Sequence, residues 1–115
     1  MTLIYSDNDI GGLEVMDRAG NWVAAPRSDG AFTVNIGDLM MRWTNDRWQS
    51  TLHRVVNPAE GDAWRSRRLS LGMFFIPNYD AEIAPLHGGA DRYPPIAIAD
   101  YRTERFARTA GGDVE

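Results

Sequence analysis

The sequence predicts an all-β fold, built as a sandwich, barrel or jelly roll, with one helix near its C-terminus. Two observations favour this class. Short apolar runs of strand length recur between Thr2 and Ile76, and clusters of Gly, Pro, Asn and Asp separate them. After Pro77 the spacing of apolar side chains changes to one that suits a helix over residues 96–108. We therefore expect one domain over residues 1–108 and a frayed tail over residues 109–115.

Strand and turn signals alternate along the chain. We expect strands, in order, at residues 2–5, 13–16, 21–24, 31–36, 51–56 and 68–76. The connections are expected turns or loops, at residues 6–12, 17–20, 26–30, 59–66 and 81–95. The second and third strands are close enough in sequence to form a hairpin. A short helix is predicted over residues 39–43, and Asp38 has the side chain to cap its N-terminus.

Composition excludes several kinds of site and partner. The chain has 115 residues, of which 43% are apolar, with no cysteine and a formal net charge of −4. The lack of cysteine excludes disulfides, thiolate metal sites and a cysteine nucleophile, so a metal would need His, Asp, Glu or backbone oxygen ligands. The negative charge provides no general attraction for nucleic acid or for anionic membranes.

The sequence lacks targeting and membrane signals. The first residues contain no basic segment followed by a long apolar run, which a signal peptide would have. No apolar run approaches the roughly 20 residues that a membrane-spanning helix needs. We therefore expect a cytoplasmic protein without a membrane partner.

The strand predicted at residues 68–76 has two chemically different faces, because side chains alternate across a strand. One face is wholly apolar and carries Leu69, Leu71, Met73 and Phe75. The other carries Arg68, Ser70, Gly72 and Phe74. A guanidinium binds a carboxylate through two parallel hydrogen bonds, and a neighbouring hydroxyl can donate a third. The second face therefore offers a site for one carboxylate of a small acid.

His53 is a candidate metal ligand. It lies in the predicted strand at residues 51–56 and shares a face with Thr51 and Val55. A neutral imidazole in such a position can bind a metal through one ring nitrogen. His87, the other histidine, lies in the predicted Gly-rich loop, and the two lack the spacing of a helical zinc motif.

Simpler interpretations account for the same residues. Arg68 and Ser70 could lie on an edge strand and face water, because this pattern of residues is common. His53 could be a core histidine that is hydrogen-bonded to a carbonyl, which is the more frequent role of a lone histidine. For His87 we expect a solvated position in the loop.

Several motifs in order resemble the isopenicillin N synthase-like family, which are non-haem iron(II) oxygenases that mostly use 2-oxoglutarate. The matching segments are Gly12-Leu13-Glu14-Val15, Val34-Asn35-Ile36-Gly37-Asp38, Arg42-Trp43-Thr44-Asn45-Asp46, Ser50-Thr51-Leu52-His53-Arg54-Val55 and Arg68-Leu69-Ser70. The match continues through Phe74-Phe75 and Pro77-Asn78-Tyr79-Asp80, so the resemblance covers roughly residues 2–100. It implies a double-stranded β-helix, or jelly roll, of which this chain would hold a part.

The resemblance also implies cofactors and site residues. His53 matches the distal histidine of the family's iron(II) site, a triad of two histidines and one carboxylate. Arg68 and Ser70 match the pair that binds the far carboxylate of 2-oxoglutarate. This agrees with the carboxylate site inferred from their shared face of the predicted strand. The implied reaction decarboxylates 2-oxoglutarate to succinate while molecular oxygen oxidises a small-molecule substrate.

One family motif is absent. The other two iron ligands come from a His-x-Asp motif expected shortly before Thr2, and the chain contains neither His-x-Asp nor His-x-Glu. We therefore expect a truncated chain whose activity alone is in question. One alternative is a non-catalytic jelly-roll module that binds a small carboxylate through Arg68 and Ser70. Another is that a partner chain supplies the missing ligands.

The missing part of the family pattern has a consequence for packing. In complete members of the family, helices cover the outside of the main sheet. Without them, the apolar face formed by Leu69, Leu71, Met73 and Phe75 would be exposed. We therefore expect an exposed apolar patch with unpaired strand edges, through which the chain could self-associate.

Overall fold

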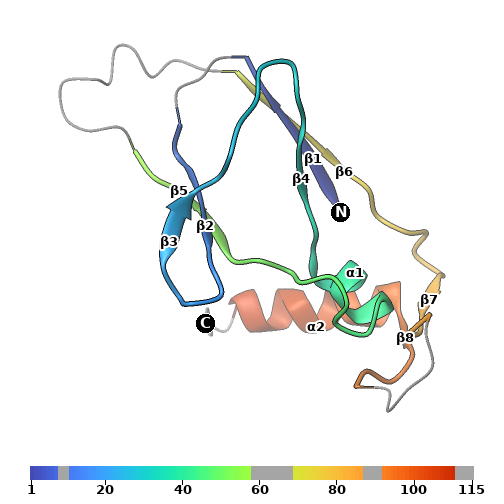
Figure 1. Ribbon diagram of the computed structural model, residues 1–115. Coiled ribbons are helices and arrows are strands. Elements are labelled where there is room, and N and C mark those ends of the chain that lie inside the picture. The colour runs from blue at the N-terminus through green and yellow to red at the C-terminus, as the bar shows by residue number, and fades with distance from the viewer. Residues whose placement is uncertain (8–10, 58–68, 87–91, 111–115) are drawn as a thin grey trace. The chain divides into compact units, whose positions relative to one another are not determined.

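The computed structural model describes residues 1–7, 11–57, 69–86 and 92–110. The chain divides into two compact units. Unit 1 comprises Met1–Gly37 with Ser50–Phe74, and unit 2 comprises Asp38–Gln49 with Phe75–Glu115. Unit 1 holds the strands of two sheets, and unit 2 holds the helices with a small strand pair (Figure 1).

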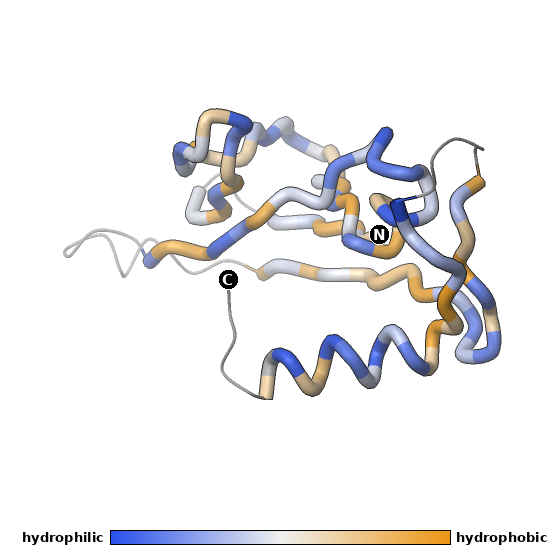
Figure 2. The backbone as a smooth tube through the Cα atoms, turned by 90° about the horizontal axis from the view of Figure 1, so that it is seen from below, coloured by the Kyte–Doolittle hydropathy of each residue, from blue (hydrophilic) through white to orange (hydrophobic). Residues whose placement is uncertain are grey.

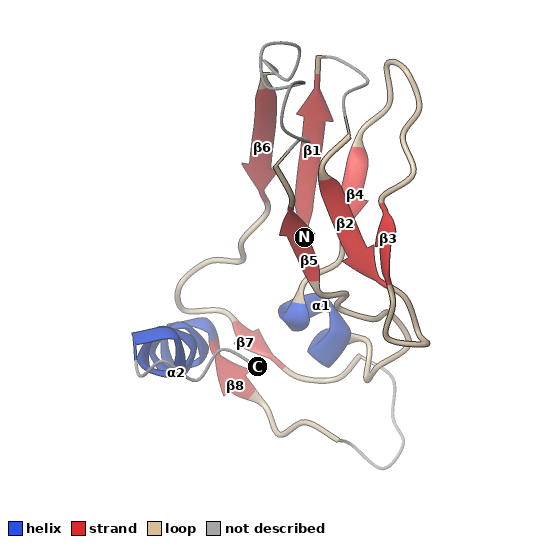
Figure 3. Cartoon of the chain, turned by 90° about the vertical axis from the view of Figure 1, so that its left-hand side faces the viewer, coloured by secondary structure: helices blue, strands red, loops and turns tan. Residues whose placement is uncertain are grey.

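The first sheet of unit 1 is three-stranded and antiparallel. Strand β1 (Thr2–Ser6) lies in the middle, with β4 (Thr33–Asn35) on one side and β6 (Ser70–Phe74) on the other. Strands β1 and β6 pair over their whole length, from Thr2 opposite Phe74 to Ser6 opposite Ser70. The cartoon in Figure 3 shows the three strands running alongside one another. This long ladder fixes which side chains of β6 share a face with those of β1.

The second sheet of unit 1 has the predicted hairpin at its centre. Strand β2 (Leu13–Met16) pairs with β3 (Trp22–Ala24) on one side and with β5 (His53–Val55) on the other, both antiparallel. Asp17 organises the hairpin turn, since its Oδ1 accepts the backbone N–H groups of Ala19 and Asn21, both at 2.8 Å. The hydrogen bond from the Asn21 backbone is the main reason why the pKa of Asp17 lies below its usual range.

Unit 2 is organised around two buried isoleucines. It contains helix α1 (Asp38–Trp43), strands β7 (Glu82–Ile83) and β8 (Ile96–Ala97), and helix α2 (Ile98–Ala110). Ile83 is 2% exposed and Ile98 is 0% exposed, so these two side chains form the core of the described residues. Figure 2 shows hydrophilic residues recurring along α2, as expected for a helix that buries only one face.

Hydrogen bonds between α1 and α2 hold unit 2 together. Asp38, the first residue of α1, accepts the Tyr101 hydroxyl on Oδ2 at 3.3 Å and pairs with Arg105 Nη2 at 2.5 Å. Burial is the largest cause that raises the pKa of Tyr101, to about 12, and the neighbouring Asp38 carboxylate adds to it. The acidic residue at the start of α1 therefore also anchors the second helix.

The predicted short helix and most predicted strands are confirmed, but four strands are shorter than expected. Strand β3 begins one residue later than predicted, at Trp22. The predictions at residues 31–36, 51–56 and 68–76 correspond to β4, β5 and β6, which lose residues at both ends. A strand extends only as far as its partner pairs with it, and β1 offers five residues to β6. The apolar pattern of a sequence continues beyond that limit, so it overestimates strand length.

The region after Pro77 differs from the prediction. The loop expected at residues 81–95 contains β7, and the helix expected from Ile96 begins at Ile98 because Ile96–Ala97 forms β8. A two-residue strand is too short to show alternation, which is why the sequence did not reveal this pair. Helix α2 continues to Ala110, two residues past the expected end, and the rest of the expected tail lies outside the described residues.

Neither of the two helices in the described part of the chain has the length and apolarity that crossing a membrane requires.

Candidate functional site

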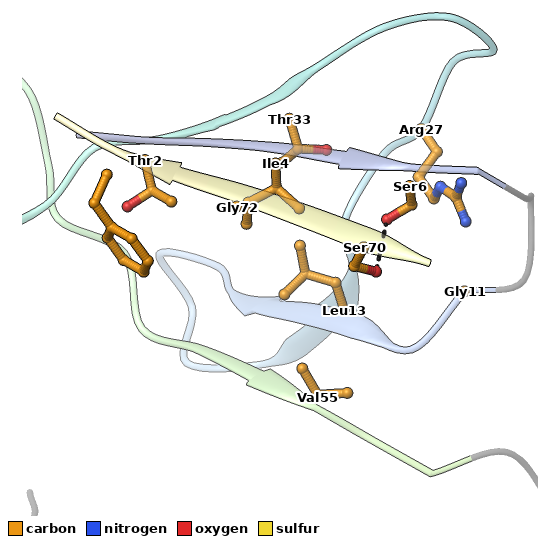
Figure 4. Close-up of a pocket in the computed structure, with 11 residues that line it drawn as sticks. Thr2, Ile4, Ser6, Gly11, Leu13, Arg27, Thr33, Val55, Ser70 and Gly72 are labelled. Atoms are coloured by element: carbon orange, nitrogen blue, oxygen red, sulfur yellow. Dashed lines mark hydrogen bonds between the residues drawn. The ribbon is translucent and has the colours of Figure 1, made fainter. Parts of the chain in front are cut away.

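A cavity of about 260 Å³ lies within unit 1, between its two sheets. The close-up in Figure 4 shows the side chains that line it. They come from the first sheet, from the second sheet and from two connecting segments. The lining residues are Thr2, Ile4, Ser6, Gly11, Leu13, Arg27, Thr33, Val55, Ser70, Gly72 and Phe74.

The cavity has a polar end and apolar walls. At the polar end, the Oγ atoms of Ser6 and Ser70 lie 3.1 Å apart and share a hydrogen bond. The Arg27 side chain lies at the same end, beside Ser6 (Figure 4). Ile4 and Leu13 contribute apolar surface from the two sheets. Such a lining suits a small acid, whose carboxylate meets the polar end while its methylene groups meet the walls.

The predicted alternation along β6 is confirmed for the described residues. Ser70, Gly72 and Phe74 all line the cavity, as expected from their shared face. Arg68 lies outside the described residues. Strand β6 is at an edge of its sheet as described, and Ser70 is exposed, as in the simpler interpretation of this strand. The hydroxyl of Ser70 nevertheless contacts Ser6 and the cavity.

The start of β6 is held in place by Asp7. The Leu69 N–H donates to Asp7 Oδ1 at 2.9 Å, and the Asp7 N–H donates to the Leu69 carbonyl at 3.1 Å. These two bonds close the β1–β6 ladder next to Ser70. Ser6 and Asp7 were predicted to lie in a turn, but Ser6 is the last residue of β1. The alternation of Thr2, Ile4 and Ser6 was the signal that could have extended the strand.

Arg27 was not among the predicted site residues, because residues 26–30 were predicted to form a turn. Its neighbours Pro26 and Ser28 are indeed turn-forming residues. Nothing in the local sequence links Arg27 to Ser6, which lies 21 positions earlier. The two come together because β4, which follows the segment of Arg27, pairs with β1.

His53 opens β5 and faces the same side of its sheet as the cavity lining. It stands opposite Val15, and Val55, two residues later, lines the cavity. Its side chain is exposed, and Nδ1 lies 3.2 Å from the Thr51 carbonyl oxygen. In the tautomer with a proton on Nδ1, that proton is donated to the Thr51 carbonyl and Nε2 keeps a lone pair, as in histidines that bind metals. The alternative of a core histidine agrees with the carbonyl contact but not with the exposure.

The described residues do not by themselves fit a metal ion. Among them, no three His, Cys, Asp or Glu side chains are grouped closely enough to hold one. A single imidazole is a weak site for iron(II), since most protein sites combine several ligands. His87, the expected loop histidine, lies outside the described residues.

Comparison with known proteins defines the family. The sequence profile described as "2OG-Fe(II) oxygenase superfamily" matches residues 1–77. The chain belongs to this superfamily. Iron(II) and 2-oxoglutarate are therefore the cofactor and cosubstrate of its family, and the predicted resemblance is confirmed.

Relatives in sequence are oxygenases of plants, fungi and bacteria. The oxidoreductase hxnY of Emericella nidulans is 38% identical over 96% of this chain and 32% of its own length. The validamycin A dioxygenase of Streptomyces hygroscopicus subsp. limoneus is 36% identical over 87% of this chain and 28% of its own length. The chain thus spans about a third of the length of the relatives that it matches.

Solved structures of the family share the fold. A 2OG-Fe(II) oxygenase family protein from Caulobacter crescentus superposes with a TM-score of 0.80 at 36% identity, covering 94% of this chain and 37% of that one. The dioxygenase for auxin oxidation in rice gives a TM-score of 0.79 at 32% identity, covering 94% of this chain and 37% of that one. The predicted fold class, part of a jelly roll with a C-terminal helix, is confirmed.

Proposed function

We propose that this chain provides the cosubstrate-binding part of an iron(II)- and 2-oxoglutarate-dependent oxygenase. Its reaction oxidises a small organic substrate with molecular oxygen as 2-oxoglutarate is decarboxylated. Arg68 and Ser70 bind the far carboxylate of 2-oxoglutarate, and His53 supplies one ligand to iron(II). Iron(II), when bound, provides the redox chemistry, but the described residues alone do not complete its site.

The observation that supports this proposal best is the chemistry of the cavity at Ser70. A hydroxyl pair at one end and apolar walls along the sides match a short dicarboxylate with a methylene chain. A carboxylate held at the polar end leaves the keto-acid end directed along the cavity. The residues of this chain therefore act by positioning, which is worth most when a cosubstrate must react in a single orientation.

The proposed substrate is a small organic molecule. One relative is named for homoarginine and another for validamycin A, which are different small molecules. The lining of the described cavity contains features for a carboxylate rather than for a particular substrate.

Calorimetric titration with 2-oxoglutarate tests the proposal. The titration is run without oxygen, with and without manganese(II) as a redox-silent substitute for iron. It is repeated with His53→Ala, Arg68→Ala and the control Arg18→Ala, whose exposed side chain does not line the cavity. We expect Arg68→Ala to weaken binding by about tenfold or more, because a bidentate hydrogen bond to a charged group is lost. Arg18→Ala should leave the affinity unchanged.

The effect of manganese(II) on 2-oxoglutarate affinity distinguishes the proposed role of His53 at the metal from that of Arg68 at the carboxylate. If binding strengthens with manganese(II) only while His53 is present, His53 acts as a metal ligand. Binding that is equally tight in the natural chain and in Arg68→Ala would contradict the proposal for the carboxylate site.

A second candidate function is a non-catalytic jelly-roll module that binds a small carboxylate through Arg68 and Ser70. The hydrogen-bonded hydroxyl pair at the end of a largely apolar cavity favours it, because these groups can bind a carboxylate without a metal. The same titration distinguishes this function, which predicts binding that is independent of metal, is lost in Arg68→Ala and is unaffected by His53→Ala.

We also propose that the chain self-associates through the outer face of its first sheet. Leu71 and Met73 stand on the opposite face of β6 from the cavity lining and are 58% and 60% exposed. Val34 stands opposite Leu3 in the same sheet and is also exposed. Adjacent exposed apolar side chains on an edge strand favour association between copies.

A further inference from the structure

Arg27 occupies the polar end of the cavity together with two hydroxyl groups. Its side chain and those of Ser6 and Ser70 all belong to the cavity lining, and they gather at one end of it (Figure 4). Of the described residues that line this cavity, Arg27 is the one with a charged side chain. A cation beside two hydroxyl groups, at the end of an otherwise largely apolar cavity, is an arrangement that favours an anion.

A carboxylate bound at the polar end of the cavity still has an acceptor position for a hydrogen bond from Arg27. When Ser6 and Ser70 share a hydrogen bond, one hydroxyl proton joins the two oxygens and the other is available to a ligand. A carboxylate presents about four lone-pair positions. On the function proposed above, Arg68 takes two of these and a serine hydroxyl takes one, which leaves one position for a further donor.

We propose that Arg27 is a second cationic contact for the far carboxylate of 2-oxoglutarate. This inference rests on the proposed function, because it concerns the same ligand and the same end of the cavity. Arg27 approaches from the segment between β3 and β4, whereas Ser70 belongs to β6, so the carboxylate is held from two sides. Arg27 thereby selects for a dicarboxylate over a keto acid that lacks the second carboxylate.

The contact between Arg27 and the far carboxylate can be isolated with two ligands, of which only one has that carboxylate. 2-Oxopentanoate has the five-carbon skeleton and the keto-acid end of 2-oxoglutarate but ends in a methyl group. Dissociation constants for both ligands are measured by protein-observed NMR titration without metal, for the natural chain and for Arg27→Ala, Arg27→Gln, Arg68→Ala and Arg18→Ala. NMR also reports whether each variant is folded. Comparing the effect of one side chain on two ligands removes general effects of the substitution.

We expect Arg27→Ala and Arg27→Gln to weaken 2-oxoglutarate binding by roughly three- to fivefold. This loss is smaller than the one expected for Arg68→Ala, because water screens the charge of an exposed guanidinium. The affinity for 2-oxopentanoate should change by less than about twofold. Glutarate, which keeps both carboxylates, should respond like 2-oxoglutarate, and Arg18→Ala should change none of the three affinities.

Three other outcomes overturn the inference, and they can be distinguished from one another. If Arg68→Ala weakens 2-oxoglutarate binding while both Arg27 variants bind like the natural chain, Arg27 does not contact the carboxylate and the proposed function stands. An equal loss for 2-oxoglutarate and 2-oxopentanoate would also contradict a role at the far carboxylate. If the folded natural chain binds neither 2-oxoglutarate nor glutarate, both the proposed function and the inference are wrong.

Discussion

Ser6 and Ser70 stand opposite each other at the end of the β1–β6 ladder, with their hydroxyl oxygens 3.1 Å apart. They are separated by 64 positions in the sequence. The pairing of the two strands brings one hydroxyl from each to the same end of the cavity in unit 1. Because a shared hydrogen bond orients both groups, this end of the cavity is arranged before any ligand binds.

Replacing Ser70 should impair binding more than replacing Ser6. We expect Ser70→Ala to weaken 2-oxoglutarate binding by about five- to tenfold, which corresponds to one hydrogen bond to a charged group. Ser6→Ala removes only the partner hydroxyl, so its effect should be smaller. Ser70→Thr keeps the hydroxyl and serves as the matched control. Equal affinities for Ser70→Ala and the natural chain, measured by titration calorimetry, would contradict a role for this hydroxyl.

Asp7 should stabilise the start of β6. In Asp7→Ala the Leu69 N–H loses its side-chain acceptor, and the free energy of unfolding should fall by about 1 kcal/mol. Asp7→Asn keeps an oxygen acceptor at the same place and should lose less. Urea denaturation followed by circular dichroism measures both. A loss that is the same for Asn and Ala would mean that the charge of Asp7, rather than its hydrogen bond to Leu69, is what matters.

Asp46 should make unit 2 sensitive to acid. Its Oδ1 accepts the Tyr93 hydroxyl and its Oδ2 accepts Arg92 Nη1, both at 2.6 Å. The Tyr93 hydrogen bond, followed by the Arg92 hydrogen bond, lowers the pKa of Asp46 below its ordinary value of 3.8. A carboxyl whose pKa is depressed on folding contributes stability above its unfolded pKa and loses it as pH falls through the folded pKa. The free energy of unfolding should therefore decline as pH falls below about 4.

The Asp46→Asn variant tests this acid sensitivity. Its melting temperature should fall less steeply with decreasing pH below about 5 than that of the natural chain. Asp80→Asn, which changes an exposed aspartate in the same unit, is the control and should keep the natural slope. Parallel slopes for Asp46→Asn and the natural chain would show that Asp46 contributes nothing to acid unfolding.

Ionisation of Tyr101 should destabilise the folded chain at alkaline pH. Burial and the nearby Asp38 raise the pKa of Tyr101 from 10.0 to about 12. A raised folded pKa means that its contribution is fully present below about pH 10 and is lost as pH rises toward about 12. Tyr101→Phe should reduce the alkaline decrease in melting temperature, whereas Tyr79→Phe, at a 62% exposed residue, should not. Identical alkaline profiles for Tyr101→Phe and the natural chain would contradict this assignment.

The outer face of β6 should mediate self-association. We expect the double variant Leu71→Lys with Met73→Lys to shift the chain toward monomer in analytical ultracentrifugation, because charges repel and remove apolar contact area. Stability should change by less than about 0.5 kcal/mol, since both side chains are exposed. Leu86→Lys, at an equally exposed (58%) residue of unit 2, is the control. A natural chain that is monomeric at high concentration would refute the proposal.

Local sequence patterns were sufficient to predict two features of the structure, the turn at residues 17–20 and the two faces of β6. The turn at residues 17–20 was predicted from its composition, and Asp17 indeed organises it through hydrogen bonds to nearby N–H groups. The alternation in β6 correctly grouped Ser70, Gly72 and Phe74 on one face. Both features depend on neighbours in sequence, so the chain itself carries the information.

The sequence by itself determined the fold class, the hairpin, the short helix, the family resemblance and the chemical character of each face of β6. Only the tertiary structure decided which residues meet at the cavity. Arg27 joins Ser6 and Ser70 because the β4–β1–β6 pairing aligns segments that are far apart in sequence. The β7–β8 pair likewise consists of strands too short to show a pattern of their own. Long-range backbone pairing sets both arrangements, and no local periodicity encodes which strands pair.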